Sequence, residues 1–323
     1  MFRVSHAGAK GFGVFATRPI ARGTRILAEK PLLSITNKDP SVLAVASRLS
    51  HGDRQRLLSL STNDAKRESL LRLAAAAWES FPSLTSITQN RELLNIFYNN
   101  NFSIAGSSGE RAIFLTVARI NHSCVPNAQG NVNTALPGGS QFTIHALRAI
   151  AGGEEITISY LHDELAIRSV RQQRLKEGYG FECACEICST VDLGESHQRR
   201  LNIRKTMAGF SEHHVGPDAA IRELFLTKAL IETYELEGLS GRELGSLYFA
   251  AASLATKLGH GKEASVLGAK GLQIEEDTVG LDSPLYAASL SALKNGHYER
   301  NRLTSDLSTP PTDSPGLSYE PWM

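Results

Sequence analysis

Three of the four cysteines in this chain lie within a stretch of six residues, and this cluster constrains the fold more than any other feature. Cys183, Cys185 and Cys188 belong to the segment YGFECACEIC, and Cys124 lies in RINHSCVPNAQGN. A structural zinc site needs four thiolate or imidazole ligands, and Cys185 and Cys188 have the spacing of a local chelate. We therefore predict one structural zinc ion held by all four cysteines, which would join two segments distant in sequence.

Two alternatives to this ligand set stay open from the residues alone. The clustered thiols could be exposed in a loop while Cys124 packs in the core as a small apolar side chain. His122 is a rival fourth ligand because it lies two residues before Cys124. A hydrolase that uses Cys124 and His122 is disfavoured, because on a strand the two would point side by side with no third group to orient the histidine.

The composition is that of a soluble globular protein. The 323 residues are 41% hydrophobic and 21% charged, with a formal net charge of +1. This length suggests one large domain or two ordinary ones, and the charge balance gives no reason to expect nucleic acid or a membrane as partner. We see no secretory signal and no apolar stretch of ~18 residues. We therefore expect an intracellular protein, nuclear or cytoplasmic, in which clustered cysteines indicate metal before disulfides.

Hydrophobic patterning divides the first part of the chain into strands and helices. Residues 1–35 contain short apolar runs around a Pro/Gly turn, which predicts strands. Residues 40–98 carry apolar residues at helical spacing in SVLAVASRL, AKRESLLRLAAAAWESF and NRELLNIFYNN, which predicts a helical insertion. Strands return in residues 102–160, where IFLTVARI and QFTIHAL are rich in β-formers and LPGGS is predicted to be a hairpin loop.

Helices are predicted for the rest of the chain. Residues 163–180 have helical periodicity and a glycine, Gly178 or Gly180, that would end the helix. Residues 195–300 are predicted to form an all-α, tetratricopeptide-like region, and the Ser/Pro-rich residues 301–323 a disordered tail. Three arginines share one face of the first helix at three-residue spacing, and we expect that face to be solvated: Arg168, Arg171 and Arg174.

Four ordered motifs make the chain recognisable as a whole: GAKGFGVFATRPIARGTRIL, NHSCVPN, GEEITISY and YGFECACEIC. Together they resemble the SET-domain protein lysine methyltransferases, in the branch related to the SET-and-MYND family and its fungal-type relatives. The resemblance covers residues 1–190, interrupted by the insertion at residues 40–98. That insertion contains no cysteine, so the zinc finger of the SET-and-MYND proteins, and partner binding by it, should be absent.

The resemblance implies a mixed α+β fold with a pseudoknot, in which the NHSCVPN segment passes through a loop closed around GEEITISY. The two segments would build the site for the methyl donor S-adenosylmethionine (SAM). A post-SET zinc segment at residues 179–190 would take its fourth ligand from the cysteine of NHSC. This is the ligand set that the cysteine count suggested independently: Cys124, Cys183, Cys185 and Cys188.

The resemblance also assigns roles to single residues. Tyr160, at the end of EEITISY, matches the catalytic tyrosine of the family. Asn121 and His122 match residues that meet SAM, partly through their backbone. The glycine-containing loop that approaches the cofactor corresponds to Lys10, Gly11, Phe12 and Gly13.

Three further residues are candidates for the cofactor site. Tyr179 and Phe181 precede the cysteine cluster, and their aromatic faces could pack on the adenine and close the site. Asn100 lies in NNNFSI, where three consecutive asparagines leave its register less certain. Asn127 is expected to fix the local turn instead.

The sequence thus predicts a SAM-dependent lysine methyltransferase that acts on a histone or another protein, as a monomer. The helical region 195–300 is expected to form one wall of a peptide groove beside the SET core. The alternative is a SET-fold scaffold without activity that binds a protein partner through its helical C-terminal region.

Overall fold

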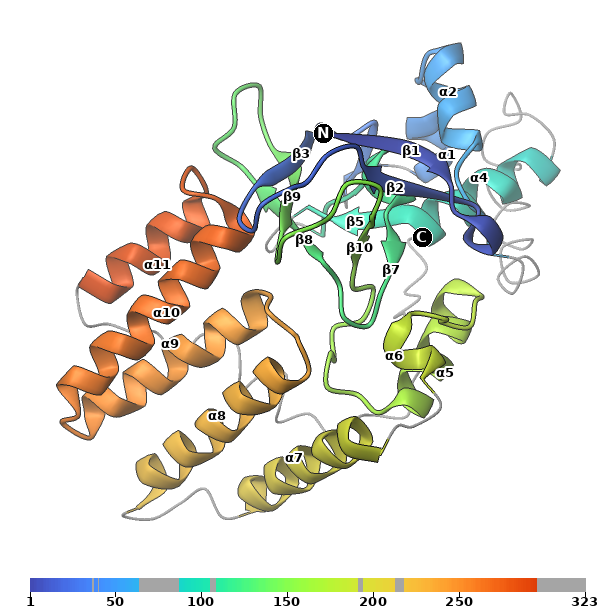
Figure 1. Ribbon diagram of the computed structural model, residues 1–323. Coiled ribbons are helices and arrows are strands. Elements are labelled where there is room, and N and C mark those ends of the chain that lie inside the picture. The colour runs from blue at the N-terminus through green and yellow to red at the C-terminus, as the bar shows by residue number, and fades with distance from the viewer. Residues whose placement is uncertain are drawn as a thin grey trace.

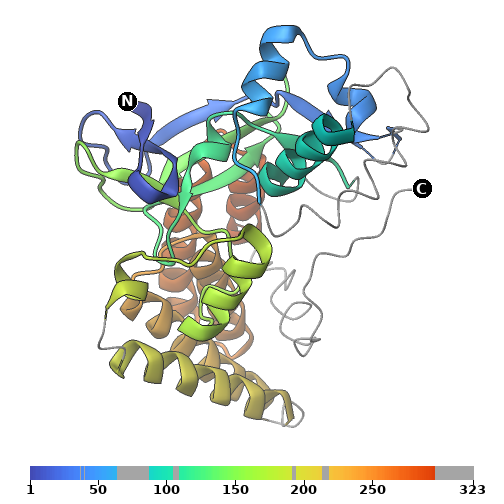
Figure 2. The same ribbon diagram turned by 90° about the vertical axis from the view of Figure 1, so that its right-hand side faces the viewer.

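The chain folds around three small β-sheets, with helices at opposite ends. The computed structural model describes residues 1–36, 38–39, 41–63, 87–104, 109–190, 194–212 and 218–294. Figure 1 shows the strands in the upper half of the molecule, the insertion helices above them to the right, and the C-terminal helices below. Figure 2, turned by 90°, keeps this order from top to bottom. The mixed α+β fold with a helical C-terminal region is therefore confirmed.

Ten strands form the three sheets in the described part of the chain. The first has the order β1 (Phe2–His6), β2 (Phe12–Ala16), β10 (Glu155–Ile158), β7 (Asn121–His122). The second has the order β3 (Arg25–Glu29), β9 (Gln141–Ala146), β8 (Ala128–Asn133). The third has the order β4 (Leu33–Ile35), β6 (Arg111–Ile113), β5 (Asn101–Ser103).

The pairing of β7 with β10 brings two of the sequence motifs side by side. The two strands are parallel, with Asn121 opposite Thr157 and His122 opposite Ile158. Strand β10 also pairs antiparallel with β2, which carries the glycine loop. Parallel neighbours require a long connection between them, and here that connection contains the whole β8–β9 hairpin. This topology places the segments NHSC and EEITISY next to each other.

The hairpin loop was predicted correctly, whereas IFLTVARI was not a strand throughout. LPGGS joins the antiparallel strands β8 and β9, and Gly138 and Gly139 have φ of 85° and 101° there, which favours glycine. Strand β6 ends at Ile113, and a 3-10 helix follows at Val117–Arg119. The carboxylate of Glu29 accepts hydrogen bonds from the backbone N–H groups of Thr116 and Val117, at 2.9 and 3.0 Å. This contact from β3 overrides the local β propensity.

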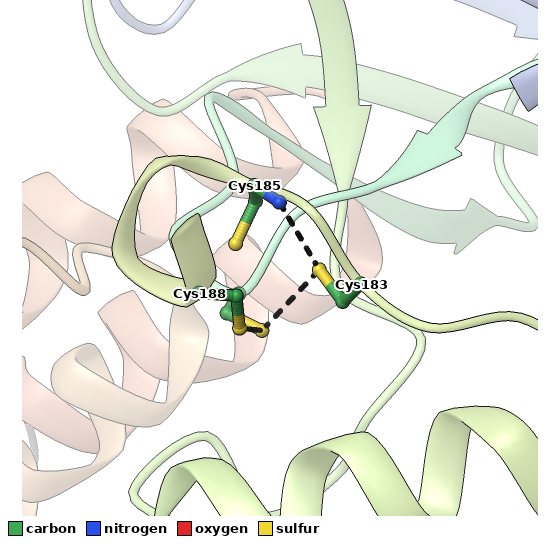
Figure 3. Close-up of side chains that lie close together, drawn as sticks. Cys183, Cys185 and Cys188 are labelled. Carbon is green, nitrogen blue, oxygen red and sulfur yellow. Dashed lines mark hydrogen bonds between the residues drawn. The ribbon is translucent and has the colours of Figure 1, made fainter. Parts of the chain in front are cut away.

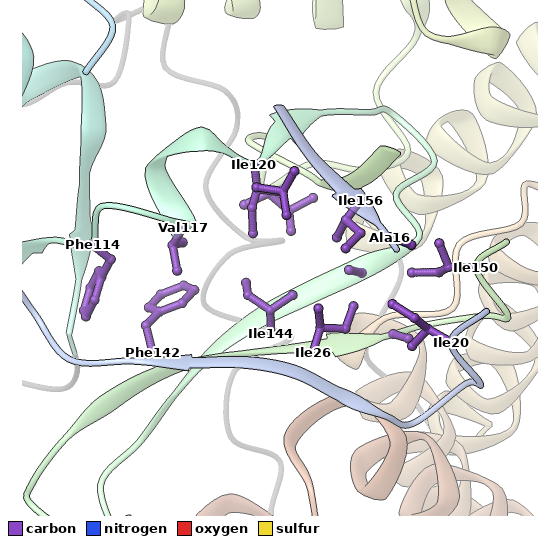
Figure 4. Close-up of a cluster of buried hydrophobic side chains, with 14 of the residues drawn as sticks. Ala16, Ile20, Ile26, Phe114, Val117, Ile120, Phe142, Ile144, Ile150 and Ile156 are labelled. Atoms are coloured by element: carbon purple, nitrogen blue, oxygen red, sulfur yellow. The ribbon is translucent and has the colours of Figure 1, made fainter. Parts of the chain in front are cut away.

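The core between the sheets is made of aliphatic and phenyl side chains. Figure 4 shows them filling the space between the strands of the first two sheets and the 3-10 segment. Ile144 and Ile156 are fully buried, because alternate residues of β9 and β10 face this core. Among the labelled members are Ala16, Ile20, Ile26, Phe114, Val117, Ile120, Phe142 and Ile150.

The insertion is helical where it is described, as predicted. Its helices are α1 (Val42–Ala46), α2 (His51–Leu58) and α4 (Ile87–Asn100). Serine side chains cap the first two, since Ser41 Oγ accepts from Ala44 N and Ser50 Oγ from Asp53 N, both at 3.1 Å. The predicted helix in AKRESLLRLAAAAWESF lies outside the described residues.

After Tyr160 the chain forms α5 (Arg168–Tyr179) and α6 (Glu186–Ser189). The predicted helix therefore begins at Arg168 and not at Asp163. Its end is set by Gly180, which has φ of 80° and donates its N–H to the Lys176 carbonyl at 2.9 Å. This is the left-handed C-terminal cap that glycine favours, so Gly180 ends the helix and Gly178 lies within it.

The C-terminal region consists of helices in the described residues 194–212 and 218–294. They are α7 (Gly194–Glu212), α8 (Ala219–Leu236), α9 (Arg242–Lys257), α10 (Gly261–Val279) and α11 (Pro284–Lys294). Consecutive helices pack on one another, and α10 also contacts β8 and β9. A Cβ atom at Gly271 would lie 3.1 Å from the Gly245 carbonyl oxygen, so glycine permits the close approach of α9 and α10.

The finer predictions about this region stay predictions. Consecutive packing is compatible with a tetratricopeptide-like array, and the domain bounds at residues 190 and 195 are not tested by the fold. The predicted disordered tail, residues 301–323, lies outside the described residues. In the described part of the chain, no helix combines the length and the apolar character needed to cross a bilayer.

Candidate functional site

The end of β10 and the end of β7 place Tyr160 beside His122. The backbone N–H of Tyr160 donates to Nδ1 of His122 at 3.0 Å, and the ring centroids lie 5.3 Å apart. Asn127 ties the same strands together: its Nδ2 donates to the Glu155 carbonyl and its Oδ1 accepts from Thr157 N, both at 2.8 Å. Asn127 thus fixes the loop after NHSC to β10.

The hydroxyl of Tyr160 has a defined orientation. Its Oη donates to the backbone carbonyl of Ile120 at 2.7 Å. Burial raises the pKa of this phenol, with the neighbouring Tyr179 as a smaller cause, so the group is a neutral hydroxyl at physiological pH. Since its one proton is used by Ile120, the lone pairs of Oη are left as acceptors.

Aromatic side chains surround Tyr160. The ring of Tyr179 lies 4.8 Å from it between centroids, and the ring of Phe181 lies 6.3 Å away. Tyr179 Oη also donates to the Tyr160 carbonyl at 3.4 Å. The last residue of α5, Tyr179, and the nearby Phe181 therefore pack as predicted cofactor residues against the predicted catalytic tyrosine.

His122 lies between Tyr160 and the cysteine cluster. Its Nε2 is 3.3 Å from Cys124 Sγ, a contact that the side-by-side arrangement predicted for these residues did not anticipate. Burial lowers the pKa of His122 to about 4, so the ring is neutral. Because Nδ1 accepts from Tyr160, Nε2 carries the proton and donates to the sulfur. A histidine in this tautomer cannot take a proton from Cys124 through Nε2, which excludes the hydrolase arrangement.

The glycine loop reaches the same strands from the other side. Asn121 Nδ2 donates to the Phe12 carbonyl at 3.1 Å and to Glu155 Oε1 at 2.7 Å. Lys10 Nζ forms an ion pair with Glu155 Oε2 at 2.7 Å. A Cβ atom at Gly13 would lie 2.6 Å from Glu155 Oε1, so glycine is required there for this arrangement.

Glu155 is a site residue that the sequence analysis missed. It connects Lys10 with Asn121, both of which were predicted. The motif GEEITISY contains it, but two consecutive glutamates gave no reason to choose one. Gly11, with φ of 79°, ends the short 3-10 helix at Gly8–Lys10 and turns the chain into β2.

Asn100 lies apart from these residues. It ends α4, and its Nδ2 donates to the carbonyls of Ile96 and Ser61, at 2.7 and 2.8 Å. Its buried side chain therefore holds the segment after α2 against α4. A direct contact of Asn100 with the cofactor stays a prediction.

The insertion contacts the segment Gly178–Phe181, which carries the two aromatic residues, through Asn63. No pattern in the sequence marks Asn63 as a supporting residue. Asn63 exchanges hydrogen bonds with Asn95 of α4, at 2.7 and 2.8 Å. Its Nδ2 donates to the Gly178 carbonyl at 3.3 Å, and a Cβ atom at Gly180 would lie 2.6 Å from Asn63 Oδ1. The helical insertion thus supports the turn that carries Tyr179.

The four cysteines converge, although they come from two distant segments. Their Sγ atoms all lie within 4.8 Å of one another, and Cys124 Sγ is 3.9 Å from Cys183 Sγ and 3.6 Å from Cys188 Sγ. Figure 3 shows the three labelled cysteines with their sulfurs around a common space. Four sulfurs 2.3 Å from a zinc ion would be about 3.8 Å apart in a tetrahedron. The cluster therefore fits a zinc ion, and all four cysteines are free of disulfides.

The protonation of the thiols shows why a cation suits this place. The pKa of Cys124 is raised, first through its hydrogen bond with Cys183, and that of Cys185 is lowered, first through its hydrogen bond with Cys124. Crowded sulfurs cannot all ionise without a cation, so they share protons unequally. A divalent metal removes the conflict, because all four can then bind as thiolates.

Arg171 corrects the prediction of a solvated arginine face. Only 3% of Arg171 is exposed, whereas the Arg174 side chain is 42% exposed. Arg171 Nη2 lies 3.8 Å from Cys188 Sγ. Side chains three residues apart lie about 60° apart around a helix, so the three arginines span a wide arc and its middle member, Arg171, faces inward.

Comparison with known proteins agrees with the resemblance seen in the motifs. A family profile described as "SET domain" matches residues 11–161. "Histone-lysine N-methyltransferase set5" of Schizosaccharomyces pombe is 30% identical over 292 residues, which are 88% of this chain and 81% of that protein. "N-lysine methyltransferase SMYD2" of Homo sapiens is 30% identical over 188 residues, 56% of this chain and 40% of that protein.

Among solved structures, the "SET domain of LSMT bound to Lysine and AdoHcy" aligns with 97% of this chain and 92% of that one, at 14% identity and a TM-score of 0.39. The sequence matches are the stronger finding, since one of them spans most of both chains. The chain belongs to the SET-domain lysine methyltransferases, in the branch related to the SET-and-MYND proteins.

Proposed function

We propose that this protein transfers a methyl group from SAM to the side-chain amine of a lysine in a protein. One observation supports the proposal: the β7–β10 pairing brings together the segments of Asn121, His122 and Tyr160, with the glycine loop against Asn121 and the rings of Tyr179 and Phe181 against Tyr160. Family membership supports the same reaction.

SAM supplies an electrophilic methyl group on a sulfonium. The lysine nitrogen forms the new N–C bond as the S–C bond breaks, and the electron pair of that bond stays on sulfur. The amine must be neutral to attack, and a free lysine has a pKa of about 10.4. The buried, aromatic surroundings of Tyr160 favour the neutral amine, because burial disfavours a charged group.

Tyr160 is the residue to which we assign the catalytic role. Its hydroxyl donates a hydrogen bond to the backbone carbonyl of Ile120, so the lone pairs of its oxygen are available to the reactants as acceptors. An oxygen held in this way can orient the amine and contact the polarised C–H groups of the methyl. Alignment of the two reactants accounts for most of the rate that the protein needs to supply.

The residues around Tyr160 are assigned to SAM binding. Lys10, Gly11, Phe12 and Gly13 form the loop that closes over the Asn121 side chain. Tyr179 and Phe181 offer aromatic faces for the adenine. Asn121, His122 and Asn100 complete the proposed set, and Glu155 is added because it fixes the positions of Lys10 and Asn121.

A structural zinc ion held by the four cysteines is the second part of the proposal. The sulfur distances support it. The metal would not contact the reacting atoms. It would hold α6 and the Tyr179–Phe181 segment against the end of β7, and so keep the aromatic wall in place.

The helical C-terminal region is proposed to border the groove for the protein substrate. Leu165, five residues after Tyr160, belongs to the same apolar core as α8 and α9, so these helices continue directly from the site. The substrate, a histone or another protein, the monomeric state and the nuclear or cytoplasmic location stay predictions from the sequence.

The decisive experiment is methyl transfer from isotope-labelled SAM to a whole-cell protein extract, followed by peptide mapping of the labelled lysines. Tyr160→Phe protein at the same concentration is the control. Labelled lysines that depend on Tyr160 support the enzyme. SAM binding without transfer to any protein would favour the scaffold alternative.

A further inference from the structure

Two arginines are buried beside the cysteine cluster. Arg171 of α5 is 3% exposed and Arg200 of α7 is 1% exposed. Both donate to the same backbone oxygen, the carbonyl of Ala166, at 2.5 and 3.1 Å. Two guanidinium groups that share one acceptor lie within a few ångströms, and burying a charge is costly unless an opposite charge compensates it.

The carboxylate nearby does not compensate both arginines. Glu237, whose side chain is 3% exposed, accepts from Arg200 Nε at 2.8 Å. It also accepts from Arg199 Nε at 2.8 Å, and Arg199, whose side chain is 31% exposed, pairs in addition with Glu195 at 3.3 Å. Within the described residues, Arg171 has no carboxylate at ion-pair distance, and its side-chain partners are the Ala166 carbonyl and Cys188 Sγ.

Each arginine also keeps an unused donor. Arg171 Nε and Arg200 Nη2 are buried and have no hydrogen-bond partner within the described residues. Buried donors without a partner are rare in folded proteins, and nearby negative charge would offset the cost of burying these two. The cysteine cluster is the source of such charge beside Arg171.

The charge of the cluster depends on metal. Four thiolates around a zinc dication carry a net charge of minus two. That charge would compensate Arg171, whose buried guanidinium lies 3.8 Å from Cys188 Sγ and has no carboxylate at ion-pair distance within the described residues.

We propose that Arg171 is the charge partner of the four-cysteine centre, and that its link to Arg200 through the Ala166 carbonyl makes the docking of α7 and α8 depend on metal occupancy. The inference rests on the zinc centre proposed above. The connection runs from Cys188 through Arg171, the Ala166 carbonyl and Arg200 to Glu237 at the end of α8. Metal loss leaves Arg171 buried without a counter-charge, and α7 and α8, which are linked to it through the Ala166 carbonyl, Arg200 and Glu237, separate from α5.

The first test measures zinc affinity by competition with a chromophoric chelator. Arg171→Leu keeps the four ligands and removes the guanidinium, with its charge and its contacts to the Ala166 carbonyl and Cys188. Loss of an outer-shell partner typically lowers metal affinity by about 10–100-fold, and we expect a loss in this range. Arg174→Leu is the matched control, since it removes an arginine from the exposed face of the same helix, and should leave the affinity unchanged. An Arg171→Leu protein with wild-type zinc affinity would overturn the proposal.

The second test uses the unmodified protein and hydrogen exchange. Zinc removal by a chelator should accelerate amide exchange at least about tenfold in α7 and α8 as well as in the cysteine segment. Protection lost in the cysteine segment but kept in α7 and α8 contradicts the proposal. This measurement also decides the question if Arg171→Leu fails to fold.

The two proposals fail separately. Absence of zinc from well-folded wild-type protein removes the metal centre itself. Normal zinc content with unchanged affinity in Arg171→Leu removes only the role of the arginines. Methyl transfer is not needed as a readout in either case.

Discussion

The two sides of the Tyr160–His122 pair are held by contacts of opposite kinds. On the proposed cofactor side, Lys10 and Glu155 form an ion pair whose side chains are 44% and 18% exposed. On the proposed metal side, Arg171, Arg200 and all the cysteines except the half-buried Cys185 are buried. A surface ion pair contributes little and rearranges easily, whereas a buried charge network tolerates no missing member.

The difference indicates which side admits a ligand. The loop of Lys10 and Phe12 can change its contacts at small cost when a cofactor enters, since Phe12 is itself 53% exposed. The metal side has no such freedom and supplies a fixed wall. Substitutions should therefore damage the two sides to very different extents, and the following predictions run from the largest expected effect to the smallest.

Cys185→Ser should have the largest effect, because it removes a metal ligand. We expect zinc content to fall from about one per chain to near zero, with loss of order in the Tyr179–Cys188 segment. Structural zinc contributes on the order of 10 kcal/mol to the folding of small modules. Elemental analysis and hydrogen exchange measure both effects. A Cys185→Ser protein with full zinc content and a protected segment would contradict the ligand assignment.

Tyr160→Phe tests the junction of the two sides. The ring stays, but the hydroxyl that donates to Ile120 is lost. Loss of one well-placed polar group costs about 10²-fold in rate, roughly 2.7 kcal/mol. We expect turnover to fall by this factor while SAM affinity, measured by calorimetry, and zinc content stay within about twofold of wild type. Unchanged turnover would remove Tyr160 from the mechanism.

His145 of β9 provides a reference for the comparison of the two sides. It is a buried titratable group that belongs neither to the proposed cofactor site nor to the proposed metal ligands. Burial, and then Arg25, lower its pKa to about 4. Between pH 6.5 and 4 the unfolded chain therefore binds a proton that the folded chain does not. The free energy of unfolding should therefore decrease as the pH is lowered through this window, by up to about 1.4 kcal/mol per pH unit from this group.

His145→Gln is the variant that isolates this contribution. Denaturant titrations at several pH values should show a shallower fall for the variant than for the wild type. Equal slopes would mean that His145 titrates normally in the folded protein.

Glu155→Gln should have the smallest effect on stability. It removes the half-exposed pairing with Lys10, which is worth at most about 1 kcal/mol, and keeps an oxygen for Asn121. We expect unchanged zinc content, a small loss of stability and weaker SAM binding, by up to about tenfold. If this variant lost its zinc, the two sides would not be independent and the comparison would fail.

From the sequence, the residues that converge in the candidate site were easier to predict than the residues that hold them in position. The motifs located Tyr160, His122 and the cysteines because each motif is short and contiguous. The supports come from distant places: Asn63 from the insertion, Glu155 from one of two adjacent glutamates, Arg171 from a row of three arginines. No local pattern distinguishes the inward arginine from the outward ones, because only the packing of α5 against the cysteine segment selects it.

Local propensity also failed where a distant side chain intervened. The pattern of IFLTVARI predicts one strand. In the structure, however, the Glu29 carboxylate accepts hydrogen bonds from two of its backbone N–H groups, and its second half begins a 3-10 helix. By contrast, the end of α5 at Gly180 followed the local rule, since a left-handed cap requires little from the rest of the molecule.

The contact of Asn63 with Gly178 and Gly180 has a consequence for the order of assembly. During synthesis Asn63 emerges long before these glycines, and Cys124 emerges long before Cys188. The insertion and the NHSC segment must therefore wait for the same late stretch of chain, and contacts between such distant residues form slowly. A nascent chain that stops before Cys188 already contains the predicted cofactor residues of the glycine loop and the strands. It lacks one of the four proposed metal ligands, so the segment that carries Tyr179 and Phe181 is not yet held in place. Translation itself thus delays the appearance of a competent protein until the cysteine segment has left the ribosome.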